Sequence, residues 1–274
     1  MGKPWAEVIG DPIAHSKSPL IHAFWLAKLD IDAEYRACLV RPSELRDYFA
    51  QRRGNTEWRG CNVTIPHKIE AIGFCDTLSR EASRVRAVNC IYEEQGRLVG
   101  QNTDVDGILE ALPEALMPAG SEVCILGTGG AARAAFAACK SRGVATVASS
   151  ARNQPAGLAL LEEFALPGSA RPIEDPLNYQ CAEVLINATS LGMEGKDPLP
   201  SVVPDNFRNP DLVVFDMVYS PLDTELLAAA RSSGLRTVDG LAMLIGQAAA
   251  AFRLFFGEPP PRQHDAELRA LLTA

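Results

Sequence analysis

Apolar residues along this chain occur in short runs, separated by polar segments that often contain glycine or proline. Runs of this kind predict buried β-strands, and longer stretches of helical spacing predict helices. One stretch contains both: 123–126 predicts a strand, a glycine turn follows, and 131–140 predicts a helix. Other strands are predicted at 6–9, 33–39, 87–92, 145–150, 182–186 and 212–217, and other helices at 21–28, 42–52, 105–112, 224–233, 241–256 and 264–272, with a loop over 196–210. This order of strands and helices predicts an α/β fold.

The turn after the strand at 123–126 contains Gly127, Gly129 and Gly130. A helix that begins directly after such a turn presents unpaired backbone N–H groups, to which a phosphate can bind. Glycines also allow the backbone to approach that phosphate closely. Ala132 stands where the common dinucleotide motif has its third glycine. Glycine turns also join strands to helices for purely structural reasons, but the strand and helix on either side favour dinucleotide binding.

Polar side chains interrupt the apolar segment 60–68. Asn62 and Thr64 alternate with apolar residues, so they share one face of the predicted strand. Pro66 ends that strand, and Lys68 is predicted to open the next helix. A lysine in this position is either an ordinary solvated residue or part of a site at the carboxyl end of the strand.

Two further polar residues, Asn89 and Asp104, lie near other predicted strands. Asp104 fits two interpretations, since it can cap the helix at 105–112 or face a cleft. Lys68, Asn89 and Asp104 each belong to a separate strand end. Their convergence is hard to explain by capping alone.

The loop before the first helix contains Ser16 and Ser18. Ser18 precedes Pro19, which is the pattern of a helix N-cap followed by proline at the first helical position. Alternatively, the two hydroxyls lie on one side of an extended loop and hold a carboxylate without a charged group. The spacing leaves both interpretations open.

Composition limits the class of protein further. A chain of 274 residues is long enough for one large domain or two smaller ones. Its formal charge of −8 argues against a nucleic-acid or anionic-membrane surface. The cysteines form no Cys-x-x-Cys pair, the four histidines have no metal-ligand spacing, and no apolar run is long enough to span a bilayer. These features predict a cytoplasmic protein without a metal centre.

Several motifs, taken together, resemble the shikimate dehydrogenase family. They are Ser-Lys-Ser-Pro at 16–19, Asn-Val-Thr-Ile-Pro-His-Lys at 62–68, Ala-Val-Asn at 87–89, Asn-Thr-Asp at 102–104, Gly-Thr-Gly-Gly-Ala-Ala at 127–132, Asn-Ala-Thr-Ser-Leu-Gly-Met at 187–193 and Asp-Gly-Leu-Ala-Met-Leu-Ile-Gly-Gln at 239–247. They cover nearly the whole chain in the order that the family has.

The resemblance implies roles for individual residues. Lys68 and Asp104 match the family's catalytic pair. The residues that match its substrate site are Ser16, Ser18, Asn62, Thr64, Asn89, Tyr219 and Gln247. The residues that match its cofactor site are Gly127, Thr128, Gly129, Gly130, Ala131, Ala132, Arg152, Thr189, Met217 and Gly240.

The cofactor is expected to be NADP, with NAD as a weaker alternative. An arginine after the second strand of a nucleotide-binding unit fits the 2′-phosphate of NADP, whereas an acid fits the ribose of NAD. The segment 149–155 contains Arg152 and no acid. Relatives usually have Asn-Arg-Thr here and a second arginine further along. In this chain Ala151 replaces the asparagine, and Ala156 stands where the second arginine would be.

The resemblance also implies two domains and a reaction. Residues 1–104 and 240–274 would form an α/β substrate domain, residues 105–239 a Rossmann-like dinucleotide-binding domain, and the site would lie in the cleft between them. The implied reaction is the reversible reduction of 3-dehydroshikimate to shikimate in chorismate and aromatic amino-acid biosynthesis. Alternatives are a quinate/shikimate dehydrogenase, a paralogue acting on a related cyclohexene acid, or a non-catalytic NADP sensor. The expected partner is a small-molecule substrate, and the assembly a monomer or homodimer.

Overall fold

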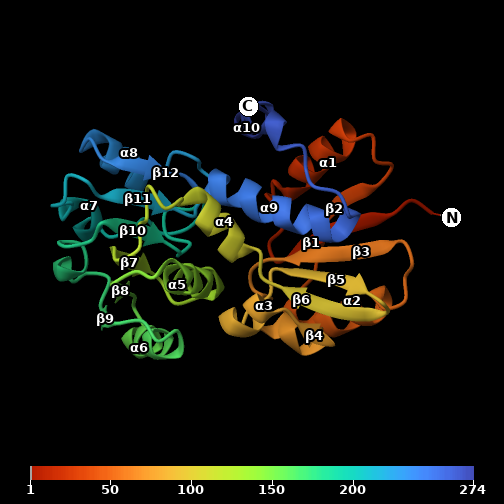
Figure 1. Cartoon of the computed structure of the whole chain (residues 1–274), viewed down its shortest axis with the longest axis horizontal. Helices are drawn as coiled ribbons and strands as arrows, with labels where there is room; N and C mark the ends of the chain where they lie inside the picture. Colours follow the sequence, from red (N-terminus) through yellow and green to blue (C-terminus); the bar gives the residue numbers. More distant parts are fainter. Residues whose placement is uncertain (1) are drawn as a thin grey trace. The chain divides into compact units, whose positions relative to one another are not determined.

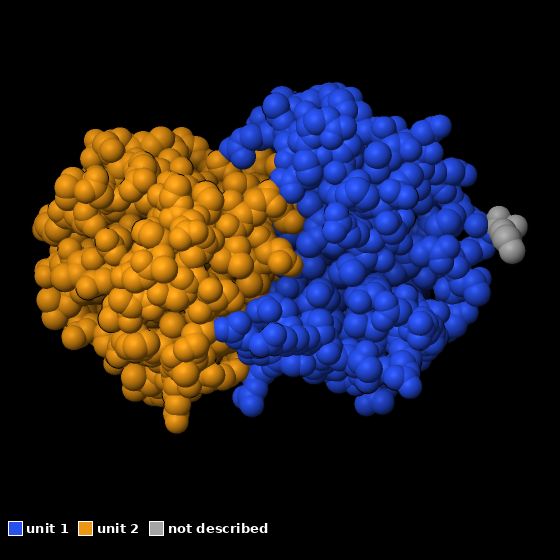
Figure 2. Space-filling view, in the orientation of Figure 1, with its two compact units in different colours: residues 1–103, 247–274 blue, residues 104–246 orange. Residues whose placement is uncertain are grey.

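The computed structural model describes residues 2–274. The chain forms two compact units (Figure 2). Unit 1 contains residues 1–103 and 247–274, and unit 2 contains residues 104–246. Each unit has its own six-stranded sheet and its own apolar core. The chain is therefore an α/β protein with two sheets, as its pattern predicts.

The sheet of unit 1 consists of β1 (Trp5–Gly10), β2 (Glu34–Leu39), β3 (Trp58–Val63), β4 (Thr77–Leu78), β5 (Cys90–Glu94) and β6 (Arg97–Gln101). Its strand order is β2-β1-β3-β5-β6-β4. β1 pairs in parallel with β2 and β3, whereas β5 runs antiparallel to β3 and β6. The central strands β1 and β3 are almost fully buried, as expected for strands covered on both faces.

The helices that belong wholly to unit 1 are α1 (Ser18–Lys28), α2 (Leu45–Arg52), α3 (Arg80–Val85) and α10 (Asp265–Thr273), with the 3₁₀ segments η1 (Pro42–Glu44), η2 (Glu70–Phe74) and η4 (Arg262–His264). α1 packs against β1, β2 and α10 (Figure 1). It buries Ile21 and Trp25, four residues apart and thus on one helix face. The core of the unit also contains Trp58 and Phe49.

Unit 2 has an entirely parallel sheet formed by β7 (Glu122–Leu126), β8 (Thr146–Ser150), β9 (Gly168–Arg171), β10 (Val184–Asn187), β11 (Val213–Asp216) and β12 (Arg236–Val238). The strand order is β12-β11-β10-β7-β8-β9. Numbered along the unit, this is the doubly wound order 3-2-1-4-5-6 read from the other edge. In that arrangement a dinucleotide binds beyond the carboxyl ends of the strands, where the order reverses.

The helices of unit 2 are α4 (Asp104–Ala111), α5 (Gly130–Arg142), α6 (Gln154–Glu163), α7 (Val202–Asp205) and α8 (Glu225–Ser232), with the 3₁₀ segment η3 (Pro176–Asn178). α5 and α6 pack against each other and against β7, β8 and β9. α8 packs against β11, β12 and α7 (Figure 1). Helices therefore pack against the β7–β8–β9 part of the sheet and against its β11–β12 part.

The long helix α9 (Gly240–Phe256) runs without a break from unit 2 into unit 1. The structure divides the chain at 103/104 and 246/247, whereas the expected domain limits are 104/105 and 239/240. The second division falls inside α9, and nothing along a continuous helix marks where one domain ends and the next begins. The limits of the domains as working parts therefore stay a prediction.

Some local predictions differ from the structure. The expected loop at 196–210 contains the short helix α7, and α6 was not predicted although Asn153 caps it and Pro155 lies in its first turn. Asn89 precedes β5 rather than lying inside it. Lys68 lies in a turn rather than at the start of a helix, and its carbonyl oxygen accepts the Val88 N–H at 2.8 Å, a partner far along the chain.

Candidate active site

Four buried polar residues of unit 1 are joined by hydrogen bonds and are called the amide cluster here: Asn62, Asn89, Thr103 and Gln247. The side-chain NH₂ of Asn62 donates to the carbonyl oxygen of Asn89 at 3.2 Å. The NH₂ of Asn89 donates to the hydroxyl of Thr103 at 2.9 Å and contacts Oε1 of Gln247 at 3.4 Å. Four distant segments thus bring polar groups together at one place in an otherwise apolar unit.

The β3 end of unit 1 positions Thr64 and Lys68, which are both half-buried. The N–H of Thr64 donates to the carbonyl of Ile9 at 2.9 Å, which extends the β1–β3 pairing by one residue. A side chain at Gly10 would collide with the methyl group of Thr64, so glycine is required there. The backbone bond between Lys68 and Val88 places the lysine next to the residue before Asn89.

Ser16 and Ser18 lie at the start of α1, with Ser16 half-buried and Ser18 buried. The N-cap interpretation of Ser18 is wrong, because α1 already begins at Ser18 and Lys17 occupies the N-cap position. No side chain caps this helix end; the Ser16 hydroxyl accepts the Ser18 N–H at 3.3 Å. The carboxylate-binding interpretation of the two hydroxyls stays a prediction.

The glycine turn of unit 2 connects β7 to α5. It contains Gly127, Thr128 and Gly129, and the first turn of α5 contains Gly130, Ala131 and Ala132. Gly129 is the N-cap of α5 and provides no side-chain cap, so the helix presents its first backbone N–H groups without one. A Cβ at Gly129 would meet nothing within 4 Å, so there is open space beside these donors. Gly127 has a φ of 102°, and a Cβ there would lie 2.9 Å from Cγ2 of Thr189.

The loop after β10 contains Thr189 and lies next to this turn. The buried side chains of Asn187 and Asp216 hold it in place through hydrogen bonds. The Oδ1 of Asn187 accepts from the N–H and the hydroxyl of Thr189, at 3.1 and 2.7 Å. The NH₂ of Asn187 donates to Asp216 at 2.9 Å, and the Thr224 hydroxyl donates to the other carboxylate oxygen at 2.7 Å. Burial raises the pKa of the Asp216 carboxyl, and these hydrogen bonds oppose that shift.

Met217 follows directly after β11, and Gly240 opens α9, both within unit 2. A Cβ at Gly240 would collide with the backbone carbonyl of Met217, so only glycine fits this approach. Tyr219 is half-buried in the loop after β11, and burial raises the pKa of its hydroxyl. The structure places Tyr219 in unit 2 and the other predicted substrate residues in unit 1.

Arg152 is exposed just beyond the end of β8. Within residues 2–274 it forms no ion pair, and the neighbouring Asn153 accepts the Ala156 N–H at 3.1 Å to cap α6. The guanidinium is therefore available beside the N-terminus of a helix, where anions are favoured. This arrangement and the glycine turn fit a dinucleotide that carries phosphates.

The catalytic pair expected from sequence is divided between the units. Lys68 belongs to unit 1, and Asp104 is a buried residue at the start of α4 in unit 2. Their pairing stays a prediction. Among residues 2–274, no group of three histidine, cysteine, aspartate or glutamate side chains could hold a metal ion, and no helix is long and apolar enough to cross a bilayer.

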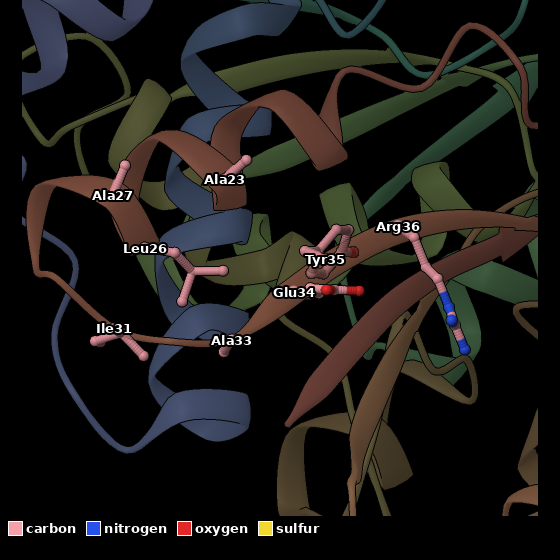
Figure 3. Close-up of a pocket in the computed structure, with 8 residues that line it drawn as sticks. All are labelled: Ala23, Leu26, Ala27, Ile31, Ala33, Glu34, Tyr35 and Arg36. Atoms are coloured by element: carbon pink, nitrogen blue, oxygen red, sulfur yellow. The ribbon is translucent and has the colours of Figure 1, made fainter. Parts of the chain in front are cut away.

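A separate surface pocket lies in unit 1 between α1 and β2 (Figure 3). It is lined by Ala23, Leu26, Ala27, Ile31, Ala33, Glu34, Tyr35 and Arg36. None of the residues that the sequence places in the site lines this pocket. Its walls are mostly aliphatic, and the hydroxyl of Tyr35 is already bound to Oδ1 of Asn62 at 2.6 Å, so we do not assign the predicted site to this pocket.

Family models match two parts of the chain. Residues 8–91 match the shikimate dehydrogenase substrate binding domain, and residues 240–267 match the shikimate 5′-dehydrogenase C-terminal domain. A relative from Sphingopyxis alaskensis, named shikimate dehydrogenase (NADP(+)), is 47% identical over 99% of this chain and 97% of its own length. The chain belongs to the shikimate dehydrogenase family.

Solved structures agree with this family assignment. Shikimate 5-dehydrogenase from Thermus thermophilus, in complex with NADP(H) and shikimate, has a TM-score of 0.87 and 37% identity, with 98% of this chain and 99% of that chain covered. The enzyme from Listeria monocytogenes, in complex with shikimate and NAD, also has a TM-score of 0.87, with 30% identity and coverage of 97% and 96%. The resemblance seen in the motifs is thereby confirmed, as is the fold that it implies.

Some residues that shape the site were not predicted. Asp216 and Asn187 support the Thr189 loop, and Tyr35 contacts Asn62. Asn187 belongs to a motif that the sequence did single out, whereas Asp216 is an acid at the end of an apolar strand. A charged residue at the end of a buried strand is a signal that could have identified it.

Proposed function

We propose that this chain catalyses the reversible, NADP-dependent reduction of 3-dehydroshikimate to shikimate. The observation that carries the proposal is the identity of 47% over 99% of the chain to a relative named for this activity. The amide cluster and the open glycine turn support it, because the reaction needs donors for ring hydroxyls and a site for a dinucleotide.

Unit 1 supplies the proposed substrate contacts. Asn62, Asn89 and Gln247 offer carboxamides that can both donate to and accept from ring hydroxyls. Ser16 and Ser18 are the proposed partners of the substrate carboxylate, with Thr64 beside the ring and Tyr219 at the edge of the site. Hydroxyl and amide donors hold a carboxylate even though the formal charge of the chain is −8.

Lys68 is the proposed proton donor. Reduction of the ketone adds a hydride to the carbonyl carbon and a proton to the carbonyl oxygen; bound NADPH supplies the hydride. The Lys68 ammonium donates the proton to the oxygen and stabilises the negative charge that develops there. Asp104 is the proposed partner that holds the ammonium and shares its proton.

Unit 2 provides the proposed cofactor site. The first N–H groups of α5 would hold the diphosphate, Thr189 would lie beside it, and Arg152 would pair with the 2′-phosphate. Met217 and Gly240 are the proposed neighbours of the nicotinamide. Because one arginine is present where relatives usually have two, we propose that NADP is preferred over NAD by a smaller margin than in those relatives.

The deciding experiment measures initial rates of shikimate oxidation by the purified chain, with NADP and NAD in parallel and with quinate as a second substrate. We expect shikimate with NADP to have the highest kcat/KM. A higher kcat/KM with quinate than with shikimate would favour the alternative that the chain is a quinate/shikimate dehydrogenase. Cofactor binding without turnover of either acid would favour the non-catalytic sensor.

We also propose a cytoplasmic enzyme that binds no nucleic acid. All seven cysteines are free thiols, which is usual in a reducing compartment. The assembly is proposed to be a monomer or a homodimer, which light scattering after size-exclusion chromatography distinguishes.

A further inference from the structure

The hydroxyl of Tyr35 reaches the amide cluster from outside the predicted site. It donates a hydrogen bond of 2.6 Å to Oδ1 of Asn62. Both side chains are buried, at 8% and 5% exposure. Tyr35 is also one of the residues that line the surface pocket between α1 and β2 (Figure 3). Tyr35 therefore connects the edge strand of the sheet to a proposed substrate residue on β3.

The polarity of this contact is fixed by its neighbours. The carbonyl oxygen of Asn89 can only accept, so it requires the NH₂ of Asn62 at 3.2 Å. The Oδ1 of Asn62 must then face Tyr35, and the tyrosine must be the donor. Burial raises the pKa of the Tyr35 hydroxyl well above its usual range, so the O–H keeps its proton.

Packing holds the tyrosine in place. The ring of His22 stacks on the ring of Tyr35 with centroids 3.9 Å apart and an interplanar angle of 2°. Parallel pairing places Tyr35 opposite Ala6 of β1, so backbone and ring are both fixed. The hydroxyl therefore has little freedom to leave Asn62.

The hydrogen bonds of Asn62 leave one N–H for a ligand. Its NH₂ carries two hydrogens, of which the Asn89 carbonyl takes one. Among residues 2–274, this NH₂ donates no second hydrogen bond. With Oδ1 occupied by Tyr35, the group that Asn62 can offer a substrate is a donor.

We propose that Tyr35 is a positioning residue that holds Asn62 as a hydrogen-bond donor to an oxygen of a substrate ring hydroxyl. This inference rests on the proposed function, since it assigns the polarity of one contact in that site. It predicts that the substrate hydroxyl opposite Asn62 is recognised as an acceptor.

The first test compares Tyr35→Phe with Tyr48→Phe. Tyr48 is a matched control, because its buried hydroxyl also donates one hydrogen bond in unit 1, at 2.7 Å to Glu7. Tyr35→Phe should raise the KM for shikimate about three- to tenfold, the effect of one neutral hydrogen bond, with a smaller change in kcat and none in the KM for NADP. Tyr48→Phe should lower the Tm without changing either KM. An unchanged KM in Tyr35→Phe, or equal increases in both variants, would overturn the proposal.

A double-mutant cycle tests whether Tyr35 acts through Asn62. Once Asn62→Ala has removed the carboxamide, adding Tyr35→Phe should raise the KM for shikimate no further. Multiplicative effects of the two changes would show that Tyr35 acts by another route, and would refute the inference.

Asn62→Asp tests the donor polarity without changing Tyr35. The aspartate keeps an acceptor for the tyrosine and loses the NH₂, so the KM for shikimate should rise at least about tenfold. A wild-type KM in this variant would contradict the inference. The wild-type chain is the reference for all these experiments. If it does not oxidise shikimate, the proposed function is refuted. If it turns over normally and the variants are unaffected, only the role of Tyr35 is refuted.

Discussion

The side-chain oxygen of Asn89 accepts a hydrogen bond of 2.7 Å from the backbone N–H of Thr103. Because a backbone N–H can only donate, this contact fixes which end of the Asn89 carboxamide faces the chain. The NH₂ is then directed toward the Thr103 hydroxyl and Gln247. Asn89 precedes β5, Thr103 follows β6, and Gln247 belongs to α9. The hydrogen bonds of Asn89 therefore connect these three segments of unit 1.

Asn89→Ala should weaken both the fold and the proposed substrate site. The substitution leaves the buried Thr103 N–H without its acceptor, which costs about 1–3 kcal/mol of the free energy of unfolding. Urea denaturation measures this loss, and the KM for shikimate should rise in the same variant. A variant as stable as wild type would mean that the contact is replaced by water at no cost.

Ser16→Ala and Ser18→Ala should chiefly weaken shikimate binding. Each removes one proposed hydrogen bond to a charged group, worth roughly 1.5–3 kcal/mol. The exposed Ser43 serves as a control in the same unit, and Ser43→Ala should leave both KM values unchanged. If Ser16→Ala or Ser18→Ala weakens NADP binding as much as shikimate binding, this loop serves the cofactor or the fold instead.

His22 should make the chain less stable as the pH falls below about 6.5. Burial lowers the pKa of its imidazole to about 3, and neither ring nitrogen has a hydrogen-bond partner within the part of the chain that the structure describes. Between these two pKa values only the unfolded chain takes up the proton, so stability is full above pH 6.5 and decreases toward pH 3. The contribution lost from pH 7 to pH 5 is about 2 kcal/mol.

His22→Phe tests this pH dependence. The phenyl ring can keep the stack on Tyr35 and the contact with Phe252, and it takes up no proton. Urea unfolding at pH 7 and pH 5 should therefore show a decrease that is about 2 kcal/mol smaller in the variant than in wild type. Parallel decreases in both proteins would mean that His22 is hydrated or protonated in the folded chain.

Arg152→Ala should raise the KM for NADP strongly and leave that for NAD almost unchanged. The loss of a guanidinium–phosphate contact should cost on the order of 2 kcal/mol, or roughly thirtyfold in affinity. Arg236 is the control, because it lies in β12 at the far edge of the same sheet and donates to the Asp211 carbonyl. Equal losses for both cofactors in Arg152→Ala would remove it from the 2′-phosphate.

The sequence predicts those features that depend on neighbouring residues. The strand, glycine turn and helix at β7 and α5 are local, and the structure has them nearly at the predicted residues. Lys68 was misplaced because its turn is tied to the N–H of Val88, a partner far along the chain that no local pattern reveals. Tyr35 escaped notice for the same reason, since it meets Asn62 only through the pairing of β1 with β2 and β3.

The start of α1 shows a different limit. Ser before Pro is a frequent capping pattern, but the helix begins one residue earlier than that pattern predicts. Local preference alone leaves the choice between a capping serine and a binding serine open. In contrast, the missed helix α6 did have a local signal, the Asn153 cap followed by Pro155.

The central claim is that Lys68 transfers a proton in the NADP-dependent interconversion of shikimate and 3-dehydroshikimate. The most direct measurement compares kcat for shikimate oxidation with NADP between wild type and Lys68→Ala, after circular dichroism has shown that both are folded. Because the proton and the charge matter most in the transition state, kcat should fall by at least about a hundredfold, with a much smaller change in KM. Near-normal turnover by folded Lys68→Ala would contradict the account.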